Sequence, residues 1–392
     1  MNTNDFTELL SRGIAEIIGY DQLLKDLQNS RTLRLKCGFD PSFPDIHLGH
    51  MVVLRKLRQF QELGHKVVLL VGDWTAQIGD PSGKSQTRPM LSAQQVKENA
   101  ATYMEQFFRI VDREKTEVRW QSEWLASYGL LDVFTLTSHF TVAQLLARED
   151  FNNRFAAQQP ITVTEFIYPM LQGFDSVMLR NDIEFGGTDQ KFNMLVGRDL
   201  QEQAGQKPQG VLMVPLLVGT DGSKKMSKSL GNYIGIADDP ANIFGKVMSI
   251  KDEALFTYFE LLTDVPIAEI AQMRDSVLTG ANPMLYKKKL AQEIIIQLYS
   301  KEEAIAAQDH FERVVQNKET PDQIAEYKID FSKSVDLKDL LFQSGLAESK
   351  AAASRLISQG SVSVDGQKII SGDELKSGDV IRVGKRRYIK IC

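Results

Sequence analysis

Two of the five histidines in this chain stand three residues apart in the stretch HLGH, as His47 and His50 with Gly49 between them. They follow a loop stiffened by Pro41 and Pro44, and the apolar periodicity after them predicts that a helix begins here. The first turn of a helix has unpaired N–H groups and partial positive charge, so two imidazoles on one face of it suit phosphate oxygens. Gly49 has no Cβ, which lets a flat group such as a purine approach the backbone. A capped helix with two solvated histidines is the alternative, while a metal site lacks a third ligand nearby.

A cationic segment, GTDGSKKMSKSLGN, occupies residues 219–232. Lys224, Lys225 and Lys228 stand there among glycines and small polar residues, directly after the strand-like run VPLLV. The segment is therefore expected at the carboxyl end of a parallel strand, where α/β domains bind their ligands. A solvated lysine loop is the alternative. The presence of the histidine pair in the same domain favours a cationic loop that closes over phosphates.

Polar side chains also form a stripe in YPMLQGFD, where Tyr168, Gln172 and Asp175 have the spacing i, i+4, i+7 of one helix face. A stripe that faces a core is normally apolar, so a phenol, an amide and a carboxylate here predict a ligand pocket; a half-exposed amphipathic helix is the alternative. In EFGGTDQ, Asp189 follows two glycines at the end of a predicted strand. A carboxylate in that position suits a ribose diol, and a tight polar turn is the alternative.

Strand-like and helix-like segments alternate through residues 1–232, and these elements are predicted to hold the groups described above. The run at residues 66–73 is continuously apolar, as expected of a strand buried on both faces of a parallel sheet. Residues 50–64 have helical periodicity and end in a glycine. We therefore predict an α/β fold with a Rossmann-like doubly wound parallel-sheet domain over residues 1–232, a helical domain over 233–325 and a small C-terminal α+β domain over 331–392.

The composition is that of an ordinary globular chain of 392 residues, with 43% hydrophobic residues and a net charge of −5. Cys37 and Cys392, near opposite ends, cannot build a disulfide framework or a thiolate zinc site, so a reducing compartment is expected. The start of the chain lacks the apolar core of a signal peptide, and the most apolar short run, VVLLV, is too short to span a bilayer. These features predict a cytoplasmic protein with no membrane partner.

HLGH and KMSKS resemble the two signatures of class I aminoacyl-tRNA synthetases. The stretches GFDPSFPDIHLGH, IGDPSGKSQTRP, YPMLQGFDS and GGTDQKFN resemble bacterial tyrosyl-tRNA synthetases, and the similarity covers essentially the whole chain. The resemblance implies a ligase that joins L-tyrosine to its tRNA in two steps. The tyrosine carboxylate attacks the α-phosphate of ATP to give tyrosyl-adenylate and pyrophosphate, and the tyrosyl group is then transferred to the 3′-terminal adenosine. It also implies ATP as a substrate with Mg²⁺, no tightly bound protein metal, a tyrosine tRNA as partner and a homodimer.

The same resemblance assigns roles to individual residues. The catalytic, phosphate-side groups are His47, His50, Ser42, Lys84, Arg88, Lys225 and Lys228. The ATP-binding residues are Asp40, Gly49, Gly187 and Asp189, with Lys228 shared. The tyrosine-binding residues are Gly38, Asp80, Tyr168, Gln172, Asp175 and Gln190. Asp175 is expected to take the phenolic hydroxyl, while Tyr168 and Gln172 face the ammonium group together with Asp80.

Two features of this region need separate comment. GDPSGKS is not a Walker-type phosphate loop, because Ile78 stands where that motif needs a glycine. The better-known branch of the family has a tyrosine before CGFD that gives a second contact to the phenolic hydroxyl. This chain has Lys36 there, so that contact is replaced or absent and Asp175 carries more of the selectivity.

The tail over residues 331–392 contains eleven Lys or Arg against seven Asp or Glu, a basic charge that the acidic total conceals. It resembles the small RNA-binding module with the α-L motif that also occurs in a ribosomal small-subunit protein. The expected RNA-binding residues are Lys350 and Arg355 on a helix and Lys385, Arg386 and Arg387 on a last strand. SVSVDGQKI is predicted to form a hairpin with an Asp-Gly turn. A charged, solvated β-domain is the alternative.

Two other functions stay open at this point. A class I synthetase for another aromatic amino acid shares most of these features, but Asp175 argues against it. A non-catalytic RNA-binding paralogue would keep the fold, but the intact His47, His50, Lys225 and Lys228 argue against that.

Overall fold

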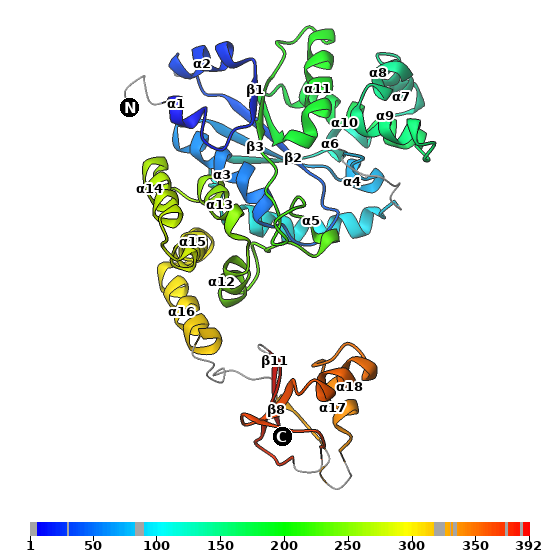
Figure 1. Ribbon diagram of the computed structural model, residues 1–392. Coiled ribbons are helices and arrows are strands. Elements are labelled where there is room, and N and C mark those ends of the chain that lie inside the picture. The colour runs from blue at the N-terminus through cyan, green and yellow to red at the C-terminus, as the bar shows by residue number, and fades with distance from the viewer. Residues whose placement is uncertain are drawn as a thin grey trace. The chain divides into compact units, whose positions relative to one another are not determined.

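The computed structural model describes residues 6–29, 31–82, 90–316, 326–329, 331, 335–372, 375–384 and 387–392. The chain folds into two compact units, Met1–Ala304 and Ile305–Cys392 (Figure 1). The predicted division at residue 232 falls inside the first unit and stays a prediction.

The first unit is built around a six-stranded sheet with the strand order β1-β6-β5-β2-β3-β4. Its strands are β1 (Glu16–Ile18), β2 (Arg34–Phe39), β3 (Lys66–Val71), β4 (Thr116–Trp120), β5 (Ile183–Gly187) and β6 (Gly210–Val214). The short strand β1 runs antiparallel to β6, and all other neighbours are parallel. The order of the parallel strands reverses between β2 and β5, so the predicted doubly wound sheet is confirmed.

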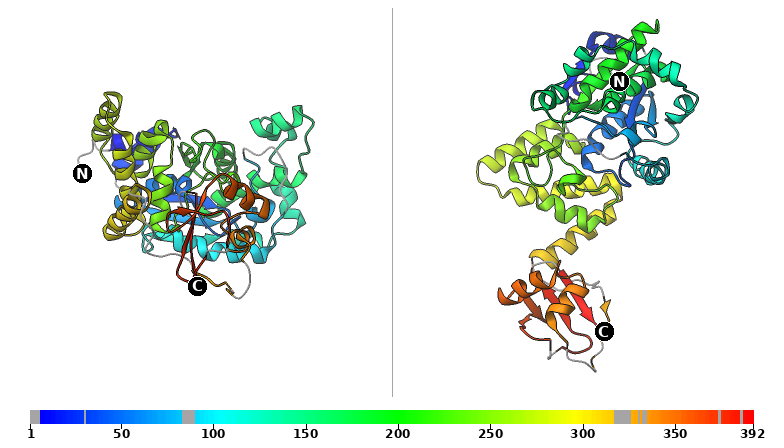
Figure 2. Two further views of the ribbon diagram at one scale, coloured as in Figure 1. Left: turned by 60° about the horizontal axis from the view of Figure 1, so that its bottom comes forward. Right: turned by 90° about the vertical axis from the view of Figure 1, so that its right-hand side faces the viewer.

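Helices cover both faces of this sheet (Figure 2). On one face α10 (Val163–Leu179) packs along α11 (Lys191–Gln203), and on the other lie α3 (Leu48–Glu62) and α5 (Ala93–Phe107). Every residue of β3 after Lys66 is buried, which explains why its sequence is continuously apolar instead of alternating. The other helical elements of this part are α1 (Phe6–Leu9), α2 (Tyr20–Gln28), α4 (Thr75–Ile78), α6 (Ser122–Leu125), α7 (Leu130–Thr137), α8 (Val142–Leu146), α9 (Glu149–Ala156), η1 (Thr188–Gln190) and η2 (Lys228–Leu230).

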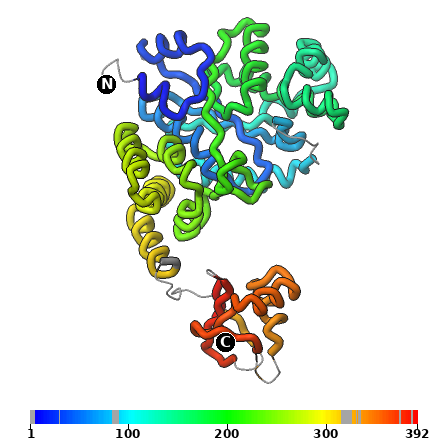
Figure 3. The backbone as a smooth tube through the Cα atoms, in the orientation of Figure 1, coloured from blue at the N-terminus to red at the C-terminus, as the bar shows by residue number. Residues whose placement is uncertain are grey.

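After the sheet the chain continues into a helical region, as predicted, and Figure 3 traces its path. Its elements are α12 (Pro240–Met248), η3 (Asp252–Ala254), α13 (Leu255–Leu262), α14 (Ile267–Leu278), α15 (Pro283–Leu298) and the beginning of α16 (Lys301–Phe311). Helix α12 packs on α15, and α13 contacts both α15 and α3. These contacts tie the helical region to α3, whose first turn contains the histidine pair.

Among its described residues, the second unit contains a five-stranded sheet with the order β7-β11-β10-β8-β9, together with helices. Its elements after α16 are η4 (Glu312–Gln316), β7 (Glu326–Tyr327), α17 (Leu337–Gln343), α18 (Lys350–Ser358), β8 (Val362–Val364), β9 (Gln367–Lys368), β10 (Val380–Val383) and β11 (Arg387–Ile391). Leu341, Val362, Ile381 and Ile391 are central members of its own apolar core. The predicted hairpin is β8–β9, whose turn residues Asp365 and Gly366 have positive φ angles of 49° and 86°. In neither unit do the described residues include a helix with the length and hydropathy to cross a membrane.

Candidate active site

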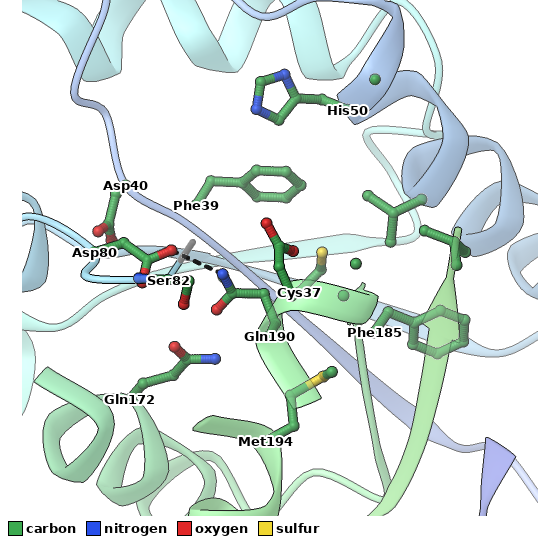
Figure 4. Close-up of a pocket in the computed structure, with 18 of the residues that line it drawn as sticks. Cys37, Phe39, Asp40, His50, Asp80, Ser82, Gln172, Phe185, Gln190 and Met194 are labelled. Atoms are coloured by element: carbon green, nitrogen blue, oxygen red, sulfur yellow. Dashed lines mark hydrogen bonds between the residues drawn. The ribbon is translucent and has the colours of Figure 1, made fainter. Parts of the chain in front are cut away.

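A cavity of about 320 Å³ lies at the carboxyl ends of β2 and β5, where the strand order reverses. Open α/β sheets bind their ligands at this position. Figure 4 shows that the side chains lining this cavity come from segments far apart in the sequence. In this view the Asp80–Gln190 hydrogen bond lies between His50 and Gln172.

Most of the predicted site residues line this cavity. Those that do are Gly38, Asp40, His47, Gly49, His50, Asp80, Tyr168, Gln172, Asp175, Gly187, Asp189, Gln190 and Lys225. Ser42 and Lys228 are not among the lining residues, although Lys228 belongs to the same loop as Lys225. Lys84 and Arg88 lie outside the described residues.

The two histidines form the N-terminal cap of α3. His47 Nδ1 accepts a hydrogen bond from the backbone N–H of Gly49 at 3.1 Å, and His50 Nδ1 accepts from the backbone N–H of His47 at 3.2 Å. Because both Nδ1 atoms are acceptors, each neutral ring carries its proton on Nε2. Burial, with a contribution from the positive charge of Lys228, lowers the pKa of His47 to about 2 and that of His50 to about 4. The pair therefore caps the helix and presents two neutral N–H donors, with His47 buried and His50 half-buried.

Glycine is needed at position 49 for a second reason. A Cβ there would meet the His47 ring at 2.9 Å, which is closer than side chains normally approach. Gly49 thus lets the His47 ring fold back over the first turn of α3 and cap it. Its role in purine approach stays a prediction.

Two of the three lysines of the cationic segment, Lys225 and Lys228, are each paired with a carboxylate. Lys225 Nζ lies 2.8 Å from Asp189 Oδ2, and Lys228 Nζ lies 2.9 Å from Asp45 Oδ2. Lys224, by contrast, has an exposed side chain. Both pairs are partly exposed, so these lysines can exchange a carboxylate partner for phosphate oxygens at modest energetic cost.

Asp175 is completely buried and holds two donors. Its Oδ2 accepts from Gln121 Nε2 at 2.7 Å and its Oδ1 accepts from Trp124 Nε1 at 3.1 Å. Burial raises the pKa of Asp175 to about 7, against the opposing effects of Lys36 and of these two hydrogen bonds. Each carboxylate oxygen has a second lone pair, so the group can still accept a hydrogen bond from a ligand hydroxyl.

A chain of side-chain amides crosses the same cavity. Gln190 Nε2 donates to Asp80 Oδ2 at 2.7 Å, and Asn193 Nδ2 donates to the side-chain oxygens of both Gln172 and Gln190 at 3.0 Å. These bonds fix which end of each amide is oxygen and which is nitrogen. The two amides and the carboxylate thereby present acceptor atoms, which suit a cationic group.

Tyr168 completes this acceptor-rich region. Its hydroxyl donates to Asp40 Oδ2 at 2.8 Å, and Asp40 Oδ1 accepts from Thr75 Oγ1 at 2.7 Å. Burial and the neighbouring carboxylates Asp40 and Asp80 raise the pKa of Tyr168 well above its usual value, so it stays a neutral phenol whose oxygen can still accept. Among the described residues, no group of three or more His, Cys, Asp or Glu side chains is placed to hold a metal ion.

Several residues that shape the site were missed in the sequence. Gln121 directly follows β4 and Trp124 lies in the short helix α6 after it, so their position near the carboxyl end of a strand was an available signal. Asn193 ends the stretch GGTDQKFN, and Glu184 is a carboxylate inside an otherwise apolar strand. Asp45 had no local signal, because its partner Lys228 is 183 residues away.

The predicted RNA-binding residues of the second unit are only partly described. Lys350, Arg355 and Arg387 have exposed side chains. Lys350 pairs with Asp339 at 2.8 Å, and Arg387 donates to the backbone oxygen of Leu346. Lys385 and Arg386 lie outside the described residues.

Comparison with known proteins gives consistent results for both units. The sequence model of the class I tRNA synthetases of the W and Y group matches residues 28–316, and that of the S4 domain matches residues 337–381. A tyrosine–tRNA ligase of Dehalococcoides mccartyi is 60% identical over 99% of this chain and 98% of its own length. The tyrosine–tRNA ligase of Haemophilus influenzae is 48% identical over 97% of this chain and 95% of its own length.

Solved structures agree with the fold of the first unit. A C-terminally truncated mitochondrial tyrosyl-tRNA synthetase of Aspergillus nidulans superposes with a TM-score of 0.66 at 21% identity, covering 80% of this chain and 93% of that one. The tyrosyl-tRNA synthetase of Archaeoglobus fulgidus, solved with L-tyrosine, gives a TM-score of 0.63 at 22% identity, covering 78% of this chain and 99% of that one.

Proposed function

The chain belongs to the class I tRNA synthetases, among the bacterial tyrosine–tRNA ligases, and we propose that it activates L-tyrosine with ATP and transfers it to a tyrosine tRNA. One observation carries the proposal. A single cavity brings together a buried carboxylate that can accept from a phenol, an acceptor-rich region for an ammonium group, and histidine donors and the Lys225 cation for phosphates. No other amino acid offers a hydroxyl at the far end of a long aromatic side chain.

Recognition of tyrosine is assigned to α10 and the residues facing it. Asp175 accepts the hydrogen bond of the phenolic hydroxyl, and phenylalanine leaves that buried acceptor without its partner. The ammonium group lies among Asp80, the Tyr168 hydroxyl oxygen and the Gln172 side-chain oxygen, which the hydrogen bonds within the site orient as acceptors. Enzymes of this class select tyrosine over phenylalanine by about 10⁵-fold, because phenylalanine leaves buried polar groups of the site without a partner.

The activation step needs no catalytic base, because the tyrosine carboxylate is already ionised at neutral pH. What accelerates it is in-line positioning and stabilisation of the charge that spreads over the phosphates. The Nε2–H groups of His47 and His50 donate to the phosphates without carrying charge themselves. ATP enters as its Mg²⁺ complex, and Lys225 and Lys228 leave Asp189 and Asp45 to bind the departing pyrophosphate.

The second unit is assigned to tRNA. Its match to the S4 domain and its exposed Lys350, Arg355 and Arg387 support a phosphate-binding surface. Such contacts release counterions, so tRNA affinity is expected to fall steeply with salt. With both described cysteines present as free thiols, we place this activity in the cytoplasm.

A homodimer is part of the proposal, and a set of exposed apolar side chains on neighbouring helices supports it. These are Leu130 (68% exposed), Leu131 (76%), Phe134 (58%), Val142 (63%), Phe155 (65%) and Val163 (77%), on α7, α8, α9 and the start of α10. Exposed apolar residues gathered on one part of a surface are typical of an interface. Phe134→Asp combined with Leu131→Asp is expected to give monomers in sedimentation velocity, and an unchanged sedimentation coefficient would contradict this surface.

ATP–pyrophosphate exchange measured with each of the twenty amino acids tests the whole proposal. Exchange is expected with tyrosine alone, followed by charging of tyrosine tRNA. Exchange with another aromatic amino acid would identify a different synthetase, and no exchange with any of the twenty would favour a non-catalytic RNA-binding paralogue.

A further inference from the structure

A buried ion pair lies behind the amino-acid end of the cavity. Lys36 in β2 and Glu184 in β5 face each other in the parallel register at the reversal point of the sheet, and their side chains approach to 2.9 Å with 0% and 2% of their surface exposed. Removing two charges from water is expensive, and an apolar pair of similar volume often gives equal or greater stability. The pair therefore calls for an explanation other than fold stability.

The charged atoms of both side chains form hydrogen bonds with residues next to the proposed tyrosine site. Besides Glu184, Lys36 Nζ donates to the backbone oxygen of Gln172 at 2.9 Å and to Ser176 Oγ at 2.8 Å, both on α10. Glu184 in turn accepts from Gln172 Nε2 at 3.2 Å, from Ser176 Oγ at 3.3 Å and from Gln209 Nε2 at 2.5 Å. Lys36 itself is not among the residues that line the cavity, whereas Gln172 and Glu184 are.

This arrangement determines the orientation of the Gln172 amide. The Glu184 carboxylate can only accept, so the amide nitrogen of Gln172 must face it. The amide oxygen then points the other way, where Asn193 donates to it, and it is available as an acceptor in the cavity. A neutral partner at position 184 would remove one of the two contacts that orient this amide and would leave the Asn193 hydrogen bond alone to keep its oxygen toward the cavity.

The pair also sets the charge around Asp175. Ser176, which Lys36 binds, is the next residue along α10, and Lys36 is the cation that acts on this carboxylate. Burial raises the pKa of Asp175, Lys36 opposes that rise and Glu184 adds to it. The groups that act on Asp175 from the elements packed against it are Lys36 (β2), Glu184 (β5), and Gln121 and Trp124 (after β4). Tyr168 on α10 has Asp175 among its own neighbouring carboxylates.

We propose that Lys36 is a positioning residue for tyrosine recognition. Together with Glu184 it holds the Gln172 amide with its oxygen toward the substrate ammonium group, and it supplies the positive charge behind the carboxylate that accepts the substrate phenol. Lys36 thus acts on the ligand through Gln172 and Asp175 without touching it. The inference depends on the tyrosine site proposed above.

Lys36→Met and Glu184→Gln test this role, because they are expected to shift the acid limb of the pH profile in opposite directions. Lys36→Met is expected to raise KM for tyrosine by about tenfold or more, the loss that follows from removing a hydrogen bond with a charged partner. KM for ATP is expected to stay within about twofold. The acid limb of the pH profile of kcat/KM for tyrosine should move to higher pH, because Asp175 loses its cation. Glu184→Gln should also raise KM for tyrosine, because the Gln172 amide is then held by Asn193 alone. Its acid limb should move to lower pH, because the negative charge of Glu184 near Asp175 is removed.

Lys56→Met is the matched control. Lys56 is also a buried lysine in the first unit, but its Nζ donates to the backbone oxygen of Leu9, which is not among the residues that line the cavity. Lys56→Met is expected to lower stability without changing KM for tyrosine or moving the acid limb of the pH profile of kcat/KM. Lys36→Met with unchanged KM and unshifted profile, or the same direction of shift in both test variants, would overturn the inference. Glu184→Gln preserves volume and keeps the test open if Lys36→Met does not fold. Exchange by the wild type with tyrosine shows separately that the proposed function holds.

Discussion

Asp175→Asn removes the charge at the phenol-binding position while keeping the shape of the side chain. The expected result is a loss of activity toward tyrosine with little change toward phenylalanine, which has no hydroxyl to lose. A hydrogen bond to a charged acceptor contributes about 1.5–3 kcal/mol, and a tenfold change corresponds to about 1.4 kcal/mol. The kcat/KM for tyrosine should therefore fall by about 10- to 150-fold.

The surroundings of Asp175 add a second, separable effect. The side-chain oxygen of Gln121 already accepts from the backbone N–H groups of Trp74 and Thr75, so its amino group has to face position 175. One oxygen of the Asp175 carboxylate accepts from Gln121 and the other accepts from Trp124. An asparagine side chain has only one oxygen to accept from both donors. One buried donor is left unsatisfied, at a cost of about 1–3 kcal/mol in stability.

The pH dependence separates charge from geometry. The folded protein releases the Asp175 proton near pH 7, while an ordinary aspartate releases it near 3.8, so between these values the folded state holds one more proton than the unfolded state. The contribution of Asp175 to stability therefore decreases as pH rises through that window. In Asp175→Asn this slope disappears, and so does the decline of kcat/KM for tyrosine below about pH 7 that comes from protonating Asp175.

The assay is ATP–pyrophosphate exchange with tyrosine and with phenylalanine, from pH 5.5 to 9, alongside urea unfolding of wild type and variant. A folded variant that keeps full discrimination between the two amino acids, and the same acid limb as wild type, would refute the assignment of Asp175 as the phenol acceptor.

Four further predictions concern the phosphates and the tail. His47→Ala is expected to lower the rate of tyrosyl-adenylate formation by about 10²-fold, because one donor to the phosphates is lost, while tyrosine affinity measured by fluorescence titration stays unchanged; a variant that loses affinity but keeps its single-turnover rate would place the residue elsewhere. Lys225→Ala and Lys228→Ala should couple by about 0.5–3 kcal/mol in a double-mutant cycle if both lysines bind one pyrophosphate, and strictly additive losses would argue against a shared ligand. Asp45→Asn should lower the Kd of pyrophosphate, because Lys228 no longer has a competing carboxylate. A chain ending at Gln316, where the synthetase match ends, is expected to keep pyrophosphate exchange and to lose most charging of tRNA, and equal charging by the truncated and full-length chains would refute the role of the second unit.

The sequence alone was sufficient for features that depend on neighbours along the chain. The apolar run of β3, the helix that begins at the histidine pair, the Asp-Gly hairpin and the helical stripe of α10 all follow from local spacing, and the structure has each of them. The doubly wound order follows from alternating strands and helices, because right-handed crossovers leave few other arrangements. The resemblance of HLGH and KMSKS to family signatures added the chemistry that such spacing cannot supply.

The tertiary structure decided how distant residues pair, and with that the state of each functional group. Asp175 meets Gln121 and Trp124 from a different strand end, Lys228 meets Asp45 across 183 residues, and Lys36 is buried against Glu184 instead of reaching a ligand. Charge, tautomer and amide orientation depend on burial and on the partners that folding brings together. Sequence spacing carries no record of those partners, because strands that are neighbours in the sheet come from segments far apart in the chain.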